Sequence, residues 1–366
     1  MYFSAYPHVY GGVERALELL AAGLQQRGWS PEVLLPADGV AAERFRRAGL
    51  HVDVMQAPDS LLVYGKATRG RRAVAAAAAL PRYWSRLARR VRGADLVHVF
   101  GHRGWTLAGP ATRLARVPSV WQVGGPEPSR AIGMAAARTS SALIAVSQSA
   151  LGTLPTSARA GAVVVPNAVA PQAFETPRSP APDGFHVACA ARLTPEKGVD
   201  VLVRAAALLR ADVPDLRILV LGGTQAGHEA YRTELTRLAD DHGVTDAVCF
   251  AGFVERPFER WAGARVYVQP SLEEGFGLAV AEAMASGLPV VASAVGGLVE
   301  VLDEGRAGLL VPPGDPAALA QNIRNLLGDP AEAARLGAAG RTRAAAHYTV
   351  DGMLDGVEAV YQRVTT

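Results

Sequence analysis

The chain has 366 residues, of which 49% are hydrophobic and 19% charged, so it is not a disordered protein and should form two domains with sizeable cores. Its two cysteines, Cys189 and Cys249, stand in apolar runs, and we interpret them as buried thiols of a cytoplasmic protein. We expect no signal peptide and no membrane span, because the longest helical apolar stretch, residues 73–80, is far short of roughly 20 residues.

The net charge of +3 is distributed unevenly along the chain. Residues 1–175 contain 20 Lys and Arg against 10 Asp and Glu, whereas residues 176–366 contain 17 against 24. This change of sign favours two domains that present different surfaces to their ligands.

The first half of the chain alternates between apolar, strand-like runs and helical patterns. A helix is predicted over residues 17–28, and an alanine-rich helix over residues 73–79. Strands are predicted over residues 30–37, 95–100, 119–123, 142–146 and 162–166. Alternation at these intervals predicts βαβ units around a parallel, doubly wound sheet.

A basic segment lies within this half, at residues 65–72 and 82–93. Its second part alternates apolar residues with Arg82, Arg86, Arg89, Arg90 and Arg92, so a helix there would present a basic, partly apolar surface. An ordinary solvated helix face and a surface for anionic lipid or a phosphorylated acceptor both fit this pattern. No nucleic acid is expected as a partner, because no nucleic-acid-binding motif accompanies the charge.

A proline-rich stretch without apolar periodicity, residues 171–184, is predicted to be a linker. After it, strands are predicted over residues 186–193, 216–223, 248–253, 265–270, 288–293 and 308–312, with helices over residues 199–209 and 229–242. We therefore predict an α/β protein with two Rossmann-like, doubly wound domains, residues 1–170 and 185–345, and an interdomain cleft for ligands.

Ligands of open parallel sheets bind beyond the carboxyl ends of the strands, where several residues stand out. Gly11 and Gly12 follow a short first strand and would let the backbone approach a ligand closely, although a plain turn fits them equally well. Arg192 and Lys197 follow the strand-like run HVACAA. Two cations at this place suit a diphosphate, and a solvated loop would also tolerate them.

The segment EEGFGLAVAEAMASGLPVVAS, residues 273–293, places two carboxylates around a glycine-rich turn. If a helix begins near Gly277, Glu274 precedes it and Glu282 lies in its first two turns, with its side chain tilted towards the N-terminus. Both carboxylates would then accept hydrogen bonds from sugar or ribose hydroxyls, because acids repel a phosphate. Alternatively, Glu282 is a solvated helix residue and Glu274 interacts only with the helix dipole.

Three motifs carry a family resemblance, namely G-G-V-E-R at residues 11–15, R-L-x-x-x-K-G at residues 192–198 and E-G-F-G-L-x-x-x-E at residues 274–282. Together they resemble the GT4-type retaining glycosyltransferases of GT-B fold. The similarity extends over nearly the whole chain, through the segments SALIAVSQSA, VVVPNAV, VCFAGFV, AVGGLVEVL and GLLVPPGDPAALA. The last helix, residues 346–366, resembles the one that packs back across the two domains in this family.

The resemblance implies a hexosyltransferase-like enzyme that moves a sugar from a nucleotide-diphosphate sugar to an acceptor hydroxyl with retention. No cofactor is implied, and no metal is expected, because the chain has no Asp-x-Asp pair. UDP is the expected carrier of the sugar, with GDP or ADP as alternatives. The acceptor would belong to a cell-envelope glycan or glycolipid or to a natural product. The Arg82–Arg92 region would make peripheral contact with the anionic cytoplasmic face of a membrane.

The resemblance also implies roles for individual residues. The catalytic residues would be Arg192, Lys197 and Glu274, of which the two cations would hold the diphosphate. The remaining donor-binding residues would be Gly11, Gly12, Val254, Gly275, Phe276, Gly277, Leu278 and Glu282. Among these, Glu282 would accept the ribose hydroxyls and Val254 would lie beside the base, while the glycine-rich turn would position the sugar.

One departure from the family concerns catalysis. Family members have a His after the strand that matches residues 119–123, and Gly124 occupies that place here. His102 is a candidate substitute for contact with the sugar or the acceptor, although a lone His is more often structural. Two alternatives therefore stay open. One is a nucleotide-sugar epimerase or pseudo-glycosyltransferase of the same fold, and the other is a non-catalytic partner that binds nucleotide-sugar.

Overall fold

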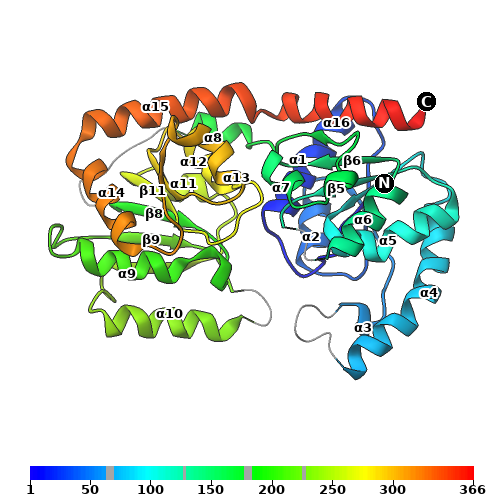
Figure 1. The fold of residues 1–366 in the computed structure, drawn as a ribbon, viewed down its shortest axis with the longest axis horizontal. Coiled ribbons are helices and arrows are strands. Elements are labelled where there is room, and N and C mark those ends of the chain that lie inside the picture. The colour runs from blue at the N-terminus through cyan, green and yellow to red at the C-terminus, as the bar shows by residue number, and fades with distance from the viewer. Residues whose placement is uncertain (63–69, 127–128, 177–183, 225–227) are drawn as a thin grey trace. The chain divides into compact units, whose positions relative to one another are not determined.

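The computed structural model describes residues 1–62, 70–126, 129–176, 184–224 and 228–366, and these form two compact units. Unit 1 contains Met1–Pro166 and Val350–Thr366, and unit 2 contains Asn167–Thr349. Each unit has a parallel β-sheet with helices packed on it (Figure 1). The predicted fold class, α/β with two Rossmann-like, doubly wound domains, is confirmed.

In the described part of unit 1, the sheet has seven parallel strands in the order β3-β2-β1-β4-β5-β6-β7. Their bounds are β1 (Tyr2–Phe3), β2 (Glu32–Leu35), β3 (His51–Val54), β4 (Val97–Phe100), β5 (Ser119–Val123), β6 (Ala142–Ala145) and β7 (Val163–Val164). β1 pairs with β2 on one side and with β4 on the other, so the strand order reverses between β1 and β4.

The helices described in unit 1 are α1 (Gly12–Gln26), α2 (Val40–Arg47), α3 (Asp59–Leu62), α4 (Arg71–Val91), α5 (Gly101–Ala115), α6 (Arg130–Thr139), α7 (Gln148–Gly152) and α16 (Val350–Thr365). α3, α4 and α5 cover one face of the sheet, where Tyr83 and Leu107 pack with Phe3 and Val99 of the strands. α1 and α16 lie side by side (Figure 1). The predicted final helix therefore begins at Val350 and belongs to unit 1.

Polar contacts fix α16 to the rest of unit 1. Arg27, at the end of α1, pairs with Asp355 at 2.6 Å and with Glu358 at 2.5 Å. The hydroxyl of Tyr361 lies 2.6 Å from Nδ1 of His98 in β4, and both residues are buried. Burial lowers the pKa of His98 to about 3, so this ring stays neutral and is a core histidine.

In the described part of unit 2, the sheet has six parallel strands in the order β10-β9-β8-β11-β12-β13. Their bounds are β8 (Val187–Ala190), β9 (Ile218–Leu221), β10 (Val248–Gly252), β11 (Val266–Gln269), β12 (Val290–Ser293) and β13 (Leu309–Val311). β8 pairs with β9 and with β11, so the strand order reverses between β8 and β11. In doubly wound sheets, ligands bind outside the carboxyl ends of the strands at such a reversal.

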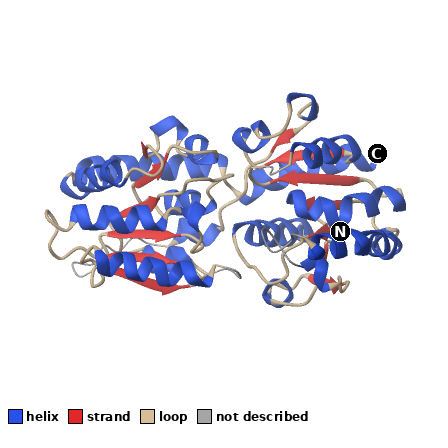
Figure 2. Cartoon of the chain, turned by 60° about the horizontal axis from the view of Figure 1, so that its bottom comes forward, coloured by secondary structure: helices blue, strands red, loops and turns tan. Residues whose placement is uncertain are grey.

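The helices described in unit 2 are α8 (Pro171–Glu175), α9 (Val199–Leu209), α10 (Glu229–Asp241), α11 (Pro257–Trp261), α12 (Leu278–Ala285), α13 (Gly297–Val301), α14 (Pro316–Gly328) and α15 (Pro330–His347). α9, α10 and α14 pack on one face of the sheet around Val187, Val220 and Val268. On the other face, Trp261 of α11 packs edge-on against Tyr267 of β11. Figure 2 shows these strands in red among the blue helices.

The prediction that both cysteines are buried is wrong for Cys249. Cys189 lies in the interior strand β8 and is fully buried, and burial raises the pKa of its thiol to about 12. Cys249 is exposed, because it lies in β10 at the edge of the sheet. Its neighbours Val248 and Phe250 pack on the helix-covered core, so the alternation of a strand points Cys249 to the opposite face.

The predicted linker, residues 171–184, begins with a helix instead of irregular chain. α8 starts at Pro171, whose fixed φ suits the first turn of a helix, and Ala173 is fully buried. Arg341 of α15 donates a hydrogen bond to the carbonyl of Phe174 at 2.6 Å, which fixes α8 on unit 2. Most of the remaining prediction falls on residues 177–183, which lie outside the described residues.

Candidate functional site

The reversal of strand order in unit 2 brings three predicted residues to one edge of its sheet. Arg192 and Lys197 follow β8, and Glu274 follows β11, the strand beside β8. Neighbouring parallel strands end at the same edge, which is where ligands bind in open α/β sheets. The structure therefore gathers the three predicted catalytic residues within one unit.

The loops that follow β8 and β11 pack directly on each other. Gly198 has a φ of 62°, and a Cβ built on it would lie 2.0 Å from the carbonyl oxygen of Pro270. The N–H of Leu272 donates a hydrogen bond to the carbonyl of Glu196 at 2.8 Å. Only glycine fits this approach, and the approach fixes the position of Lys197 beside Gly198.

Each of the two predicted diphosphate cations contacts a carboxylate. Nζ of Lys197 lies 2.7 Å from Oε2 of Glu274, and these side chains are only 14% and 16% exposed. Arg192 lies 3.9 Å from Glu196 in a more exposed pair. Burial alone would raise the pKa of Glu196, but a hydrogen bond from the Thr194 hydroxyl and the charges of Arg192 and Lys197 hold it below its ordinary value. Each of the two cations therefore has a carboxylate as a neighbour.

The glycine-rich turn after β11 is held by α13. Gly277 has a φ of 99°, which favours glycine, and α12 begins at the next residue, as predicted. The N–H of Gly297 donates to the carbonyl of Glu274 at 3.0 Å. A Cβ on Gly297 would lie 2.4 Å from the carbonyl oxygen of Gly275, so the two segments are in close contact. The backbone that carries Glu274 is therefore fixed on both sides.

Three further predicted residues of this motif are buried. Phe276 packs edge-on against Tyr348, and Leu278 is also buried, so this stretch can offer a ligand its backbone and little side-chain surface. Glu282 in α12 is 1% exposed. The alternative that Glu282 is a solvated helix residue is therefore wrong.

A row of buried polar side chains runs along β11 and was not predicted from the sequence. The hydroxyl of Tyr267 donates to Oε1 of Gln269 at 2.8 Å, and Nε2 of Gln269 donates to Oγ of Ser271 at 2.9 Å. All three residues are buried. Burial raises the pKa of Tyr267, and the nearby charges of Glu282 and Glu274 act in the same direction. The signal in the sequence that could have revealed this row is a polar group at every second position of an apolar strand, just before the glycine-rich turn.

Val254, predicted to lie beside the base, follows the edge strand β10, two strands away from β8. The residue before it, Phe253, is 50% exposed and lies near Gly223, whose built Cβ would be 3.5 Å from the Cβ of Phe253. This aromatic side chain was not predicted as a site residue. The role of Val254 stays a prediction.

The other predicted residues belong to unit 1. Gly11 caps α1, and its N–H donates to a carboxylate oxygen of Glu14 at 3.0 Å, while Gly12 is the first residue of the helix. His102 lies in the first turn of α5, where burial lowers its pKa. A Cβ built on Gly124 meets no atom within 4 Å, so packing does not forbid a larger residue there. The roles of these residues towards donor and acceptor stay predictions.

In the part of the chain that the structure describes, no three His, Cys, Asp or Glu side chains gather in a way that could hold a metal ion. The cations at the sheet edge fit a diphosphate, and the carboxylates beside them fit a polyhydroxylated group.

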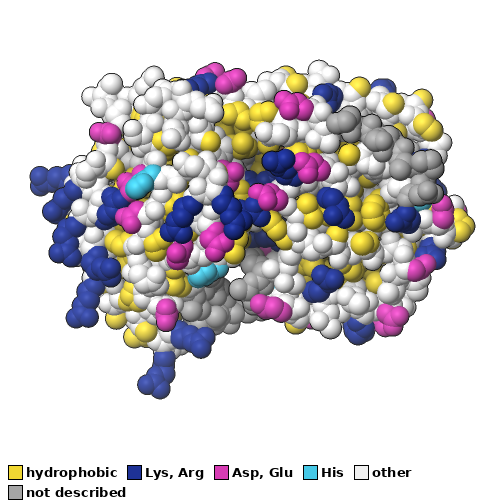
Figure 3. All heavy atoms as spheres, turned by 180° about the vertical axis from the view of Figure 1, so that it is seen from behind, with side chains coloured by type: hydrophobic (Ala, Val, Ile, Leu, Met, Phe, Trp, Pro, Cys, Tyr) yellow, Lys and Arg dark blue, Asp and Glu magenta, His cyan; other side chains and the backbone are white. Residues whose placement is uncertain are grey.

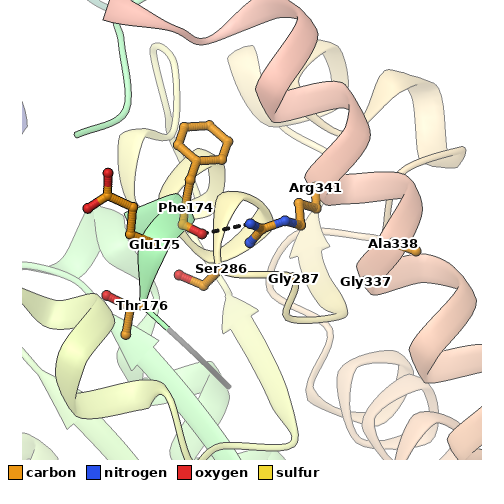
Figure 4. A pocket seen from close by; sticks show the side chains of 8 residues that line it. All are labelled: Phe174, Glu175, Thr176, Ser286, Gly287, Gly337, Ala338 and Arg341. Carbon is orange, nitrogen blue, oxygen red and sulfur yellow. Dashed lines mark hydrogen bonds between the residues drawn. The ribbon is translucent and has the colours of Figure 1, made fainter. Parts of the chain in front are cut away.

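A separate recess of about 400 Å³ lies between α8, the end of α12 and α15 (Figure 4). None of the predicted site residues lines it. The guanidinium of Arg341 donates there to the carbonyls of Ala285 and Phe174, both at 2.6 Å, so it joins helices. Close packing continues at Gly337, where a Cβ would lie 2.3 Å from the carbonyl oxygen of Gly287. The residues around the recess therefore hold helices of unit 2 together.

Solved glycosyltransferases share the fold of this chain. The Anabaena protein HepE, crystallised with UDP and glucose, superposes with a TM-score of 0.82 and 22% identity over 99% of this chain and 98% of that chain. Sucrose-phosphate synthase from Thermosynechococcus elongatus superposes with a TM-score of 0.79 and 23% identity over 99% of this chain and 98% of that chain. The fold is therefore of the GT-B class.

Two family models match consecutive parts of the chain. The model described as Glycosyltransferase Family 4 matches residues 10–173, and the model described as Glycosyl transferases group 1 matches residues 174–343. Between them they cover most of the sequence, and the chain belongs to the GT4-type glycosyltransferase family.

Curated relatives match about half of the chain. The D-inositol 3-phosphate glycosyltransferase of Streptomyces avermitilis is 39% identical over 188 residues, which are 48% of this chain and 40% of that protein. The GDP-mannose-dependent alpha-(1-6)-phosphatidylinositol monomannoside mannosyltransferase of Mycolicibacterium smegmatis is 37% identical over 175 residues, 45% of this chain and 43% of that protein. The matched region thus spans less than half the length of these relatives.

Proposed function

We propose that this protein is a metal-independent, retaining glycosyltransferase that moves a sugar from a nucleotide-diphosphate sugar to an acceptor hydroxyl. The observation that carries this proposal is the meeting of Arg192, Lys197 and Glu274 at one edge of the unit 2 sheet. Cations suit a diphosphate and a carboxylate suits sugar hydroxyls, so this edge can bind both parts of a donor. Membership of a glycosyltransferase family supports the proposal.

The proposed chemistry uses the same residues. The bond between the anomeric carbon and the diphosphate oxygen breaks, and negative charge grows on the leaving diphosphate. Arg192 and Lys197 stabilise that charge, and the N–H groups at the start of α12 add a favourable dipole. The acceptor oxygen bonds to the anomeric carbon on the face that the diphosphate leaves, and the leaving phosphate takes the acceptor proton. Glu274 and Glu282 accept hydrogen bonds from sugar and ribose hydroxyls.

The proposed donor is a UDP-sugar, with GDP or ADP as alternative carriers. Crystal structures of HepE contain UDP and UDP-glucose, which supports UDP. The relative from Mycolicibacterium smegmatis is named as GDP-mannose-dependent, which supports GDP as the alternative.

A thermal-shift panel of UDP, GDP, ADP and TDP tests the proposal. One of these nucleotides should stabilise the wild-type protein, by about 2.7 kcal/mol at about 100 times its dissociation constant. The shift should shrink in Glu282→Gln and nearly vanish in Lys197→Ala, because these variants lose the proposed ribose and diphosphate contacts.

Other results of the panel would change the proposed function. Absence of any shift for folded wild-type protein, both with these nucleotides and with their sugar derivatives, would refute nucleotide-sugar binding and with it the proposed transfer. If a nucleotide binds and its sugar derivative is converted without an acceptor product, the activity is epimerisation. Binding without any conversion in the presence of acceptors would assign the protein a non-catalytic role.

The acceptor is proposed to be anionic or carried by an anionic membrane, with unit 1 as its binding domain. Exposed arginines follow one side of α4, at Arg71, Arg72, Arg82, Arg86 and Arg89, and dark blue side chains gather along the left edge of Figure 3. Val74 adds an apolar group that is 71% exposed. Arg90 is not available to a membrane, because it pairs with Glu32 and Asp53. Residues 65–69 of the basic segment lie outside the described residues.

Two observations frame this part of the proposal. The curated relatives are named for D-inositol 3-phosphate and for a phosphatidylinositol monomannoside, which supports an acceptor that carries phosphate. In the ranges that the structure describes, no helix combines the length and the apolar character needed to cross a bilayer. The exposed arginines of α4 are what supports the proposed peripheral contact with an anionic membrane.

Vesicle co-sedimentation tests the membrane contact. Changing Arg82, Arg86 and Arg89 to Gln should lower the partition coefficient on vesicles with phosphatidylserine about 100-fold, because each arginine near an anionic surface contributes about 1 kcal/mol. The matched control changes three exposed arginines of unit 2, Arg237, Arg256 and Arg335. Binding that is insensitive to salt, or lost equally in both triple variants, would contradict a role of α4.

A further inference from the structure

The contact between Lys197 and Glu274 is built into unit 2. The two residues are 77 positions apart in the sequence, yet their charged atoms lie 2.7 Å apart and their side chains are largely buried. The Glu274 backbone is held by the N–H of Gly297, and the loop that carries Lys197 is held by the N–H of Leu272. An ion pair fixed in this way has a defined geometry, unlike a pair of mobile surface side chains.

This pair creates a conflict for the ligand that the site is proposed to bind. A diphosphate that contacts the ammonium of Lys197 must come close to the carboxylate of Glu274, because that carboxylate already lies next to the same nitrogen atom. Two negative groups at such a short distance repel each other, and the repulsion is stronger where solvent is partly excluded. Glu274 should therefore weaken the binding of a nucleoside diphosphate on its own.

The conflict is relieved when the diphosphate carries a sugar. Sugar hydroxyls donate hydrogen bonds to a carboxylate, so they can replace the ammonium as the partner of Glu274. Lys197 is then available to the diphosphate, and both charged groups keep a partner. The intact donor satisfies the pair, whereas the nucleoside diphosphate alone leaves Glu274 without one.

We propose that Glu274 acts as a displaceable counter-ion of Lys197 that favours the intact donor over the nucleoside diphosphate product. Donor binding exchanges the ion pair for two contacts, Lys197 with the diphosphate and Glu274 with the sugar. After transfer the sugar leaves, Glu274 pairs with Lys197 again, and the diphosphate is released. This inference rests on the proposed glycosyltransferase function and assigns product release to a residue of the same site.

Direct calorimetric titration of Glu274→Gln tests the inference. The probes are the nucleoside diphosphate identified in the panel, its sugar derivative and inorganic pyrophosphate. The variant should bind the nucleoside diphosphate and pyrophosphate about tenfold more tightly than the wild type does, whereas its affinity for the nucleotide-sugar should be unchanged or lower. In steady-state assays, inhibition by the product should strengthen about tenfold while kcat falls.

Two further variants separate the inference from a general effect of charge or of folding. Glu273→Gln removes one negative charge from an exposed neighbouring position, and its affinities should change less than twofold. Glu274→Ala removes the carboxylate without leaving an amide, and it should bind the nucleoside diphosphate more tightly by the same factor. It replaces Glu274→Gln in the test if that variant does not fold.

The possible results distinguish the two proposals. If wild-type protein binds the nucleotides and both Glu274 variants bind the diphosphate equally or more weakly, Glu274 is not a displaceable counter-ion, and the proposed function stands. If Glu273→Gln tightens binding as much as Glu274→Gln, the effect belongs to net charge and the inference is wrong. If neither the wild type nor any variant binds a nucleotide, the proposed function itself is wrong.

Discussion

Replacing Lys197 with alanine should lower kcat about 10²- to 10³-fold, the range observed when a preorganised donor to a developing negative charge is removed. Its ammonium lies at the reversal of strand order in unit 2, on a side chain that is 14% exposed, and the leaving diphosphate gains charge as the sugar departs. KM for the donor should rise less than kcat falls, because the interaction is strongest in the transition state. Steady-state kinetics with the donor identified in the panel measure both constants.

The variant needs a control for stability, because Lys197 is not the exposed loop residue that its sequence context suggests. Its side chain is 14% exposed and pairs with Glu274, so its loss should cost about 1–3 kcal/mol of unfolding free energy. Arg210→Ala is the matched control, since Arg210 forms a 2.6 Å ion pair with Asp246 away from the site. This control should keep wild-type kinetics. Near wild-type kcat in Lys197→Ala would remove Lys197 from the proposed mechanism.

Much of the fold could be predicted because the elements of a doubly wound sheet are strongly patterned. The strand over residues 119–123 and the helix over residues 199–209 have the predicted bounds, since a continuous apolar run and an apolar helical stripe leave little ambiguity. β3 was not predicted. Its sequence, HVDV, mixes polar and apolar residues because it is an edge strand with partly exposed side chains. The exposure of Cys249 in β10 has the same cause.

The candidate site was predictable in its placement and not in its contacts. Parallel strands end at a common edge, so the sequence could place Arg192, Lys197 and Glu274 near one another without coordinates. It could not show that Lys197 contacts Glu274, because that contact depends on two loops that pack through Gly198 and Gly297. The sequence alone predicts the cations and the acids as separate ligand contacts. The structure shows that Arg192 and Lys197 each lie next to a carboxylate.

Gly198 should therefore tolerate no side chain. We expect Gly198→Ala to lower the unfolding free energy of unit 2 by about 3–5 kcal/mol, from backbone strain at a φ of 62° and overlap of the new Cβ with the carbonyl of Pro270, 2.0 Å away. For a unit of this size, that loss corresponds to a fall in Tm of about 10 °C. Calorimetry of the purified variants measures it.

Gly243 provides the matched control for this prediction. Its φ of 65° is close to that of Gly198, but a Cβ built there meets no atom within 4 Å. Gly243→Ala should therefore show the cost of the left-handed backbone alone, about 1–2 kcal/mol. The difference between the two variants measures the close approach of the loops after β8 and β11. Because that approach positions Lys197, Gly198→Ala should also weaken nucleotide binding at temperatures where the protein is folded, whereas Gly243→Ala should not. Equal losses of stability in the two variants would show that the loops can separate without cost, and the rigid pairing of Lys197 with Glu274 would then lose its structural basis.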